Sequence, residues 1–281
     1  MLNQYNGTWH TAHGDSVLEN SQQAFHVIYR VSDKGSNTRK TKLDNATKQH
    51  CLLNAIEHFG KENIYVIADN CSEELLSFID AQGLRHEETH LGNSVSFKYA
   101  VTQVIKKYPD EDIVYMLEDD YLHLHGSMQL IIEGLEIADY VTLYDHSDQY
   151  MTFQPGAAPL NRFGLHRWKI FVTEHSHWRE APSTTMTFAA RVKTLKTDYK
   201  ILMDNPDKGS PLDFPMFLRL TKQTGIMAAL SVCWYRKALK NVVMNTFAIF
   251  RKKRLLISCI PGRSTHCEKK WLSPLTDWTK V

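Results

Sequence analysis

Short apolar runs alternate with segments of helical periodicity through the first 150 residues. The apolar runs are rich in β-branched and aromatic residues, which is typical of buried strands. Between them, apolar residues recur every three or four positions, which predicts amphipathic helices. We expect strands at residues 25–31, 63–69, 112–117 and 139–145, and helices at 46–59, 72–82, 94–108 and 127–137. This alternation predicts right-handed βαβ units and a mostly parallel sheet.

The pattern changes after about residue 150. Two strand-like runs, 169–175 and 184–192, follow one another without a helical segment between them, so we expect them to pair antiparallel. A loop rich in proline, glycine and aspartate at 203–211 leads to a short helix at 213–222. Pro215 fits the first turn of that helix, where its missing N–H costs nothing.

Composition and charge narrow the classes of function. The 281 residues can bury a substantial core, and 43% hydrophobic and 23% charged residues are ordinary values for a globular protein. A net charge of +2 argues against a nucleic-acid-binding protein. Five scattered cysteines without a CxxC pair indicate reduced thiols rather than a disulfide framework or a zinc site.

The hydropathy pattern predicts a cytoplasmic protein. No apolar run reaches the roughly 18 residues that a membrane span needs, and the polar start of the chain lacks the apolar region of a signal peptide. The basic stretch 251–254 follows an apolar run and predicts, at most, peripheral contact with an anionic membrane surface. A solvated charged face is the alternative for this stretch.

The strongest chemical signal is the acidic triplet Glu118, Asp119 and Asp120, which directly follows the predicted strand 112–117. Ligands of open α/β sheets bind beyond the carboxyl ends of the strands. Three neighbouring acids repel one another unless a cation joins them, and Mg²⁺ or Mn²⁺ prefers oxygen ligands shared with substrate phosphates. The triplet therefore predicts a divalent-cation site, with a solvated acidic turn as the alternative.

Two further features follow the neighbouring strands. Asp69 ends the strand 63–69, where a carboxylate can accept hydrogen bonds from a nucleobase or ribose, or can simply form a turn. A basic loop after the first strand can face a diphosphate or form a solvated face. Its cations are Lys34, Arg39, Lys40 and Lys42.

Together these features resemble the GT-A fold of glycosyltransferases, specifically its family-2-like members, over about residues 25–225. The resemblance implies an α/β fold with a Rossmann-like nucleotide-binding half, built on a mostly parallel central sheet, and a smaller mixed half that binds the acceptor. On this basis we expect a single domain over residues 1–281, divided into a nucleotide-sugar-binding half at about 20–150 and an acceptor-binding half with a C-terminal tail at about 151–281.

The resemblance also implies roles for individual residues around the donor. In the family, the first strand and its loop hold the nucleotide, an acid at the end of the next strand meets the base, and a DxD motif binds the metal and the diphosphate. The implied donor-binding residues are Arg30, Ser32, Lys40, Asp69, Glu118 and Asp119. Asp120 is the implied metal ligand, and the C-terminal His266 joins it on an Mn²⁺ or Mg²⁺ ion.

A second block, residues 210–220, is similar to the family's ED…LRL segment, in which a carboxylate at a helix start is the catalytic base. Asp213 falls on that acid, although Leu212 replaces the preceding glutamate. Asp204 and Asp207 are nearby rivals. A helix N-terminus favours the ionised carboxylate, which is ready to accept a proton.

The segment 173–178 carries candidate acceptor contacts. His175 and His177 share one face of a strand, because side chains two residues apart point the same way, and that spacing suits an acceptor pocket or a metal site. Trp178 can stack on the apolar face of a sugar or belong to the core. We interpret all three as acceptor-binding residues.

The sequence therefore predicts a metal-dependent glycosyltransferase that moves a sugar from a UDP-, GDP- or dTDP-sugar to a glycan or other hydroxyl acceptor. We expect inversion with Asp213 as the base, although retention stays open. A sugar-phosphate nucleotidyltransferase is an alternative enzyme, but its glycine-rich loop is represented here only by Gly35. A non-catalytic nucleotide-sugar-binding or carbohydrate-binding protein of the same fold is a third possibility.

Overall fold

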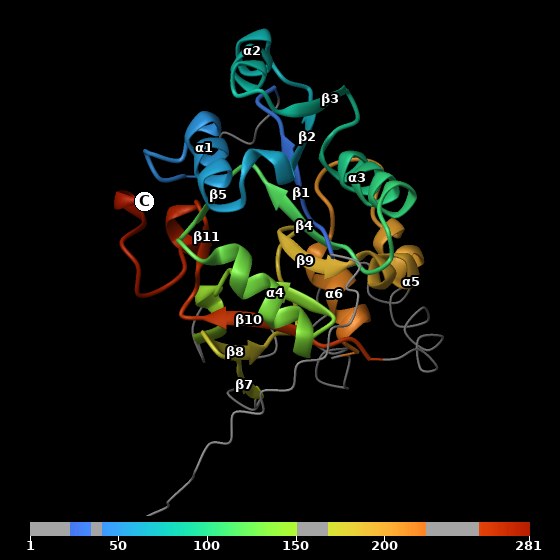
Figure 1. Cartoon of the computed structure of the whole chain (residues 1–281), viewed down its shortest axis with the longest axis vertical. Helices are drawn as coiled ribbons and strands as arrows, with labels where there is room; N and C mark the ends of the chain where they lie inside the picture. The colour runs from blue at the N-terminus through green and yellow to red at the C-terminus, as the bar shows by residue number, and fades with distance from the viewer. Residues whose placement is uncertain (1–22, 35–40, 151–167, 223–252) are drawn as a thin grey trace, which may run out of the picture.

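The computed structural model describes residues 23–34, 41–150, 168–222 and 253–281 (Figure 1). Most of the strands join one nine-stranded sheet, in the order β3-β2-β1-β4-β9-β6-β10-β8-β7. Their bounds are β1 (Phe25–Val31), β2 (Ile64–Asp69), β3 (Arg85–Thr89), β4 (Ile113–Glu118), β6 (Tyr140–Thr142), β7 (Ile170–Val172), β8 (His177–Glu180), β9 (Phe188–Arg191) and β10 (Leu256–Ile260). A separate two-stranded sheet pairs β5 (Tyr121–His123) with β11 (Ser264–His266).

The sheet confirms the predicted α/β class with a mostly parallel centre. Strands β3, β2, β1 and β4 are parallel neighbours, and β10 runs parallel to β6. Only β9 and β8 run against the other seven strands of this sheet. Strands β1, β2 and β4 read as nearly continuous apolar runs because both faces of a covered parallel sheet are buried.

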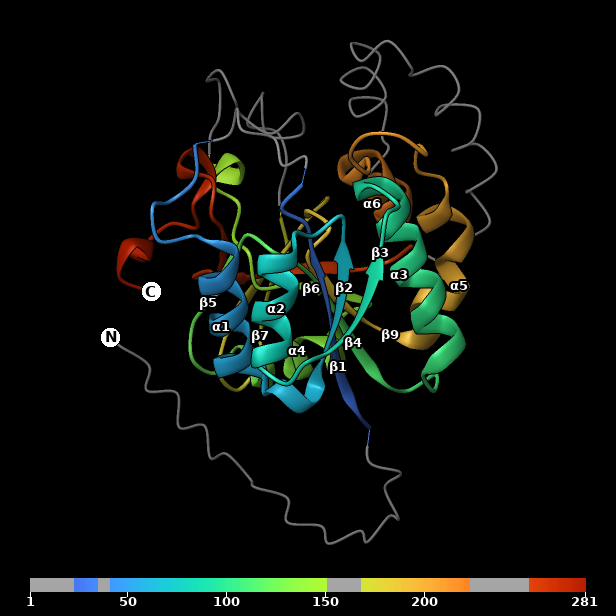
Figure 2. The same ribbon diagram turned by 90° about the horizontal axis from the view of Figure 1, so that it is seen from above.

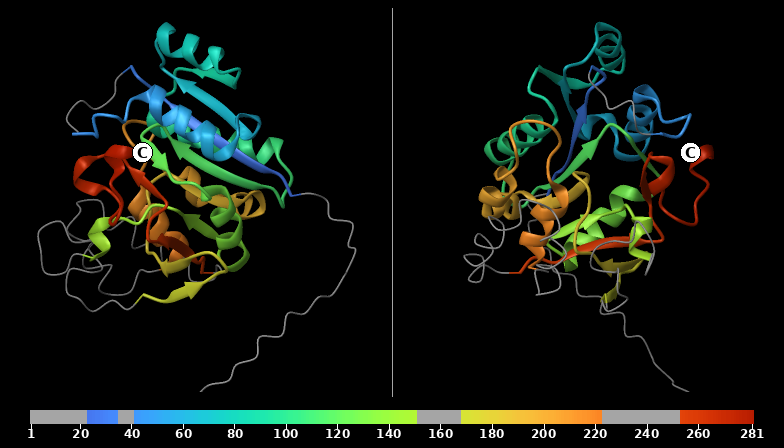
Figure 3. Two further views of the ribbon diagram at one scale, coloured as in Figure 1. Left: turned by 60° about the vertical axis from the view of Figure 1, so that its left-hand side comes forward. Right: turned by 180° about the vertical axis from the view of Figure 1, so that it is seen from behind.

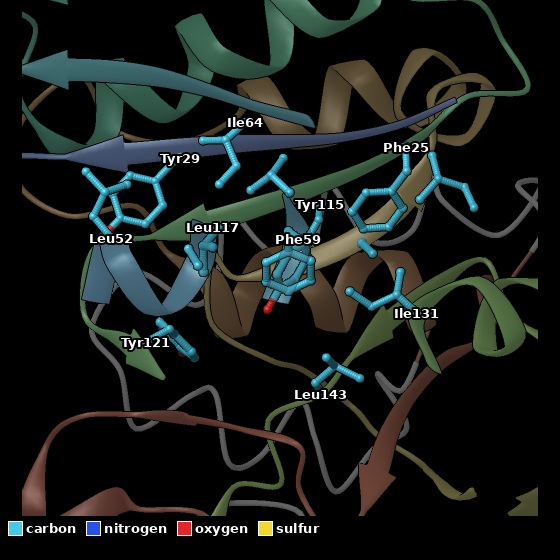
Figure 4. Close-up of a cluster of buried hydrophobic side chains, with 14 of the residues drawn as sticks. Phe25, Tyr29, Leu52, Phe59, Ile64, Tyr115, Leu117, Tyr121, Ile131 and Leu143 are labelled. Atoms are coloured by element: carbon cyan, nitrogen blue, oxygen red, sulfur yellow. The ribbon is translucent and has the colours of Figure 1, made fainter. Parts of the chain in front are cut away.

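Helices cover both faces of the sheet (Figure 2). Their bounds are α1 (Lys48–Phe59), α2 (Glu73–Ala81), α3 (Asn93–Lys107), α4 (Ser127–Ile137), α5 (Val192–Met203) and α6 (Asp213–Thr221). Helices α1, α2 and α4 bury their apolar stripes in one core cluster, which Figure 4 shows around Phe59 and Tyr115. Helices α3, α5 and α6 pack on the opposite face, around Phe97, Phe188 and Phe217.

The second half of the chain differs from the predicted pairing. The runs 169–175 and 184–192 do not pair with each other: β7 pairs with β8, whereas β9 lies between β4 and β6. The first run contains one short strand and its turn, so its neighbour is the next short strand, β8. The second run leads directly into α5, which periodicity did not reveal because β9 and α5 meet without a loop.

The C-terminal segment lies beside the chain that leads into α1 (Figure 3). The Leu43 N–H donates to the Cys267 carbonyl at 2.9 Å, and the Lys269 N–H donates to the Thr41 carbonyl at 2.9 Å. A small buried cluster of Leu43, Cys51, Leu122, Cys267 and Trp278 lies beneath these contacts. Distant parts of the sequence therefore meet at one corner of the molecule.

Two expectations from composition can be compared with this structure. The four cysteines that it describes, Cys51, Cys71, Cys259 and Cys267, are buried and form no disulfide. No helix among residues 23–34, 41–150, 168–222 and 253–281 has the length and apolar character to cross a bilayer.

Candidate active site

The parallel strands β1, β2 and β4 bring their carboxyl ends to one edge of the sheet. In the register of β1 and β4, Arg30 lies opposite Glu118. In the register of β1 and β2, Val31 lies opposite Ala68, one residue before Asp69. The predicted acids after β2 and β4 therefore lie at the same edge as the loop that follows β1.

Each acid of the triplet has its own basic partner. Glu118 Oε1 lies 3.0 Å from the Arg30 guanidinium, Asp119 Oδ1 lies 2.6 Å from Lys48 Nζ, and Asp120 Oδ2 lies 2.9 Å from Lys42 Nζ. These three cations relieve the repulsion among the three carboxylates. That repulsion was the reason for predicting a metal from the sequence. Unrelieved repulsion among these acids therefore does not call for a metal at this edge.

The buried Arg30 and the partly buried Glu118 form a pair that joins β1, β4 and α3. Arg30 also donates through Nη1 to the Asn93 carbonyl at 3.0 Å and to Asn93 Oδ1 at 3.1 Å, at the start of α3. Burial raises the pKa of Glu118, and the Arg30 charge opposes this shift. These contacts hold β1, β4 and the start of α3 together at the carboxyl edge of the sheet.

Ser32 and Asp119 join the loop after β1 to the acidic turn. The Ser32 N–H donates to Asp119 Oδ2 at 2.8 Å, while Lys48, at the start of α1, contacts the other oxygen of the same carboxylate. Both oxygens of Asp119 are therefore engaged by the chain. Lys40, the remaining predicted donor contact of this loop, lies outside the described residues.

Asp120 and His266, the two predicted metal ligands, lie together although 146 residues separate them in sequence. The pairing of β11 with β5 sets His266 opposite Tyr121, and the Cys267 N–H donates to the Asp120 carbonyl at 2.9 Å. Asp120 Oδ2 is 3.1 Å from His266 Nε2. Burial opposes ionisation of Asp120, but His266 and Lys42 outweigh it and hold its pKa well below the usual range.

This pair of donors fits a divalent ion. Asp120 Oδ2 and His266 Nε2 are 3.1 Å apart, which is a hydrogen-bond distance. The same spacing is close to the roughly 3.0 Å between neighbouring ligands of an octahedral ion with bonds of about 2.1 Å. Glu268 Oε2 lies 3.8 Å from His266 Nδ1, beyond hydrogen-bond distance, and Nε2 is the ring nitrogen that faces Asp120. No three His, Cys, Asp or Glu side chains of the described chain gather into a complete cage, so phosphate and water would supply the remaining ligands.

Asp69 stabilises the loop 89–92 through hydrogen bonds. Its carboxylate accepts hydrogen bonds from the Thr89 hydroxyl at 2.9 Å, the Leu91 N–H at 2.6 Å and the Gly92 N–H at 2.9 Å. The side chain is buried at the end of β2. It therefore shapes the turn from β3 into α3, where Gly92, with φ of 80°, is the N-cap.

Asp213 opens onto a cavity of about 250 Å³ beside the carboxyl ends of β6 and β10. It is the first residue of α6, and its Oδ1 accepts from the Phe214 N–H at 2.6 Å. The wall also includes the ionisable side chains of His146, Asp148 and Arg179. Its hydroxyl groups come from Thr142, Tyr144, Ser183, Thr184, Thr185 and Ser258. The rivals are engaged elsewhere, because Asp204 pairs with Arg219 and Asp207 pairs with Lys98.

The segment 184–187 connects this cavity with the acidic turn. The Tyr121 and Thr185 hydroxyls are 2.6 Å apart, and Thr185 also lines the cavity. The Glu118 N–H donates to the Thr187 hydroxyl at 3.1 Å. The predicted base and the predicted donor edge are thus linked through one short stretch of chain.

The predicted acceptor residues do not line the cavity. Trp178 is fully buried under α4, and its Nε1 donates to the Thr173 hydroxyl at 2.9 Å, so it belongs to the core and cannot stack on a sugar. His175 is exposed in the turn after β7, where a hydrogen bond with Glu133 of α4 raises its pKa. His177 is exposed at the start of β8 and is absent from the cavity wall.

The residue of this strand that does reach the cavity is Arg179, which the sequence reasoning missed. It is buried, pairs with Asp145 at 3.0 Å and donates to Gln149 at 3.3 Å. It lies two positions after His177, so the alternation of β8 gives both residues the same face. Its partners Asp145 and Gln149 come from a distant segment, so no local feature of the sequence marks Arg179.

No protein-family model matches the chain, and no curated protein matches it. Among solved structures it is similar to GalNAc-T7 with UDP, GalNAc and Mn²⁺, at 9% identity and a TM-score of 0.47, covering 87% of this chain and 44% of that one. It is also similar to CMP:2-keto-3-deoxy-manno-octonic acid synthetase complexed with CTP, at 12% identity and a TM-score of 0.42, covering 85% of this chain and 92% of that one.

A third similar structure is glucosyl-3-phosphoglycerate synthase from Mycobacterium tuberculosis in complex with Mg²⁺ and UDP. The identity is 10% and the TM-score is 0.37, with 72% of this chain and 65% of that chain covered.

Proposed function

We propose that this chain is a metal-dependent glycosyltransferase that uses a nucleotide-sugar donor. The observation that carries the proposal is the meeting of Asp120 and His266 at the carboxyl edge of the sheet, linked through Thr185 to a hydroxyl-lined cavity that Asp213 borders. Asp120 and His266 would hold an Mn²⁺ or Mg²⁺ ion. Such an ion, when bound, would neutralise charge on the donor's diphosphate.

The donor would lie across the strand ends, with its diphosphate at the turn 118–120 and its sugar toward the cavity. Arg30 and Lys48 would keep Glu118 and Asp119 in place rather than bind the donor directly, since each is held in an ion pair. Asp69 would shape the loop 89–92 against the nucleotide. These proposed roles revise the prediction that Arg30, Glu118, Asp119 and Asp69 bind the donor directly.

The acceptor hydroxyl would enter the cavity and attack the anomeric carbon. Its oxygen forms the new bond to that carbon while the bond from the carbon to the diphosphate oxygen breaks, and the nucleoside diphosphate leaves with the bonding electrons. Asp213 would take the hydroxyl proton. Asp213 is the first residue of α6, and a helix N-terminus favours negative charge, which suits a group that must accept a proton.

Donor transfer or hydrolysis measured with UDP-, GDP- and dTDP-sugars, each with Mn²⁺, tests the proposal. We expect Asp213→Asn to lower kcat by about 10²–10⁴-fold and Asp120→Asn to lower it by about 10²-fold or more. Asp207→Asn, whose carboxylate lies outside the cavity wall, is the matched control and keeps wild-type activity. Full activity of both Asp213→Asn and Asp120→Asn would refute the mechanism.

Product analysis separates this function from its rivals. Pyrophosphate released from a nucleoside triphosphate and a sugar phosphate would identify a nucleotidyltransferase instead. Binding of a nucleotide-sugar without turnover over a broad set of acceptors would identify a carbohydrate-binding protein. The anomeric configuration of the product, read by NMR, tests the inverting course.

A further inference from the structure

One carboxylate oxygen of Asp120 contacts two side chains. Lys42 Nζ lies 2.9 Å from Asp120 Oδ2, and His266 Nε2 lies 3.1 Å from the same atom. An ion bound to Asp120 Oδ2 and His266 Nε2 would lie close to the Lys42 ammonium, and the two positive charges would repel each other. The ammonium and the ion therefore compete for one carboxylate.

We propose that Lys42 is a displaceable counter-cation, which occupies Asp120 in the ligand-free protein and leaves that carboxylate when a divalent ion binds there. This inference rests on the metal site of the proposed function. It adds that the chain blocks its own metal site until the ion arrives. Binding of the ion alone is consequently weakened by the ion pair that it must break.

The surroundings of Lys42 confine the movement to its side chain. Hydrogen bonds from Leu43 to Cys267 and from Lys269 to Thr41 hold the backbone on both sides of Lys42 against the C-terminal segment. The side chain is 29% exposed, which leaves the flexible four-carbon stem room to swing toward solvent. A donor diphosphate at the same edge would offer the released ammonium a new anionic partner.

Lys48 provides a natural contrast. It contacts Asp119 Oδ1 at 2.6 Å, and the other oxygen of Asp119 accepts from the Ser32 N–H. This pair does not include an atom of the proposed metal ligands. Removing Lys48 deletes one positive charge from the same turn but leaves the contact between Lys42 and Asp120 in place.

The first test measures the Kd of Mn²⁺ alone by electron paramagnetic resonance of the free ion. The proteins are the wild type, Lys42→Met, Lys48→Met and Asp120→Asn, each checked for folding by circular dichroism. We expect Lys42→Met to bind Mn²⁺ about 5–150-fold more tightly than the wild type, the usual range for coupled ligands. Lys48→Met changes the Kd less, and Asp120→Asn loses the site.

Equal Mn²⁺ affinity in the wild type and Lys42→Met, with binding still dependent on Asp120, would overturn the inference alone. An equal gain in Lys42→Met and Lys48→Met would also overturn it, since net charge would then explain the result. If Asp120→Asn binds Mn²⁺ as tightly as the wild type, or if no protein binds Mn²⁺, the metal site of the proposed function is refuted as well.

A second measurement uses the unmutated chain and so does not depend on the folding of a variant. Brief acetylation of lysines, read by mass spectrometry, reports how available each amine is. We expect saturating Mn²⁺ to speed acetylation of Lys42 severalfold and to leave Lys48 and Lys269 unchanged. An unchanged rate at Lys42 while Mn²⁺ is bound through Asp120 would contradict displacement.

Discussion

At the scale of single residues, most charges at the carboxyl edge hold the edge together. Arg30 neutralises Glu118, and Asp69 accepts three hydrogen bonds from its own neighbouring loop. Asp120 differs, because its partners Lys42 and His266 come from segments on either side of the acidic turn. In the proposed function, Glu118 and Asp69 would therefore support the site, and Asp120 would be the acid that binds an ion.

The ion pair of Arg30 with Glu118 gives a prediction about stability. Arg30→Met leaves the partly buried Glu118 carboxylate without its partner, so we expect the free energy of unfolding to fall by about 1–3 kcal/mol. Lys193→Met, which breaks a solvent-exposed pair with Glu111, is the control and changes it by less than about 1 kcal/mol. Urea unfolding measures both, and similar losses in the two variants would contradict the assignment.

At the scale of elements, close packing of α4 against the sheet depends on Gly134. A Cβ atom at this position would lie 2.9 Å from Val141 Cγ2 and 3.0 Å from Trp178 Cη2. The glycine therefore allows the helix to approach the buried Trp178 ring. This contact explains why a residue that weakens helices occurs inside α4.

Gly134→Ala tests this packing. Alanine favours the helix by about 1 kcal/mol, but the clash costs typically about 1–3 kcal/mol, so we expect a net loss of stability. In the background of Trp178→Phe, whose smaller ring leaves space, the same substitution costs less. A double-mutant cycle by urea unfolding measures the coupling, and additive losses would exclude the Trp178 contact as the cause.

The elements that the sequence predicted are those with a strong local pattern. The first-half strands and helices were expected because apolar runs and helical stripes mark β1, β2, β4 and the first four helices. Strand β3, with the polar sequence RHEET, carries no such pattern because it lies at the edge of the sheet. Strands β5 and β11 are too short to show a period, and they pair with each other across a long sequence separation.

The residues of the candidate site also include some that the sequence predicted and some that it did not. The acidic triplet was noticed because it directly follows a predicted strand, and His266 was predicted beside it only through the family resemblance. The partners Lys48 and Arg179 could not, since ion pairs between distant segments leave no local signal in one sequence. Trp178 was assigned wrongly because a tryptophan beside histidines gives the same sequence whether it lines a pocket or fills the core.

At the scale of the whole molecule, one buried histidine links stability to pH. His123 in β5 is buried and hydrogen bonds with the Tyr115 hydroxyl at 2.9 Å. Burial lowers the pKa of His123 to about 3. The native state therefore keeps this ring neutral at pH values where the unfolded chain, with a pKa of about 6.5, binds a proton.

Through His123, acid destabilises the native state relative to the unfolded state. Between pH 6.5 and 3 the unfolded state holds one more proton at His123, so this residue lowers stability by about 1.4 kcal/mol for each pH unit of acidification. We expect His123→Gln to flatten the dependence of the unfolding free energy on pH in this window, whatever its stability at pH 7. Identical slopes for variant and wild type from pH 6 to 4 would contradict a neutral His123.

The position of β10 has a consequence for biosynthesis. In the part of the chain that the structure describes, β8 joins the sheet only through β10, which also covers the edge of β6. Both β6 and the β7–β8 hairpin leave the ribosome well before residues 256–260. The edges of β6 and β8 therefore stay unpaired until β10 is synthesised and inserts between them. During that time each edge can pair with a wrong strand. A nascent chain halted before residue 256 would accordingly resist proteases around β1 and β4 while its β7–β8 hairpin is still cut.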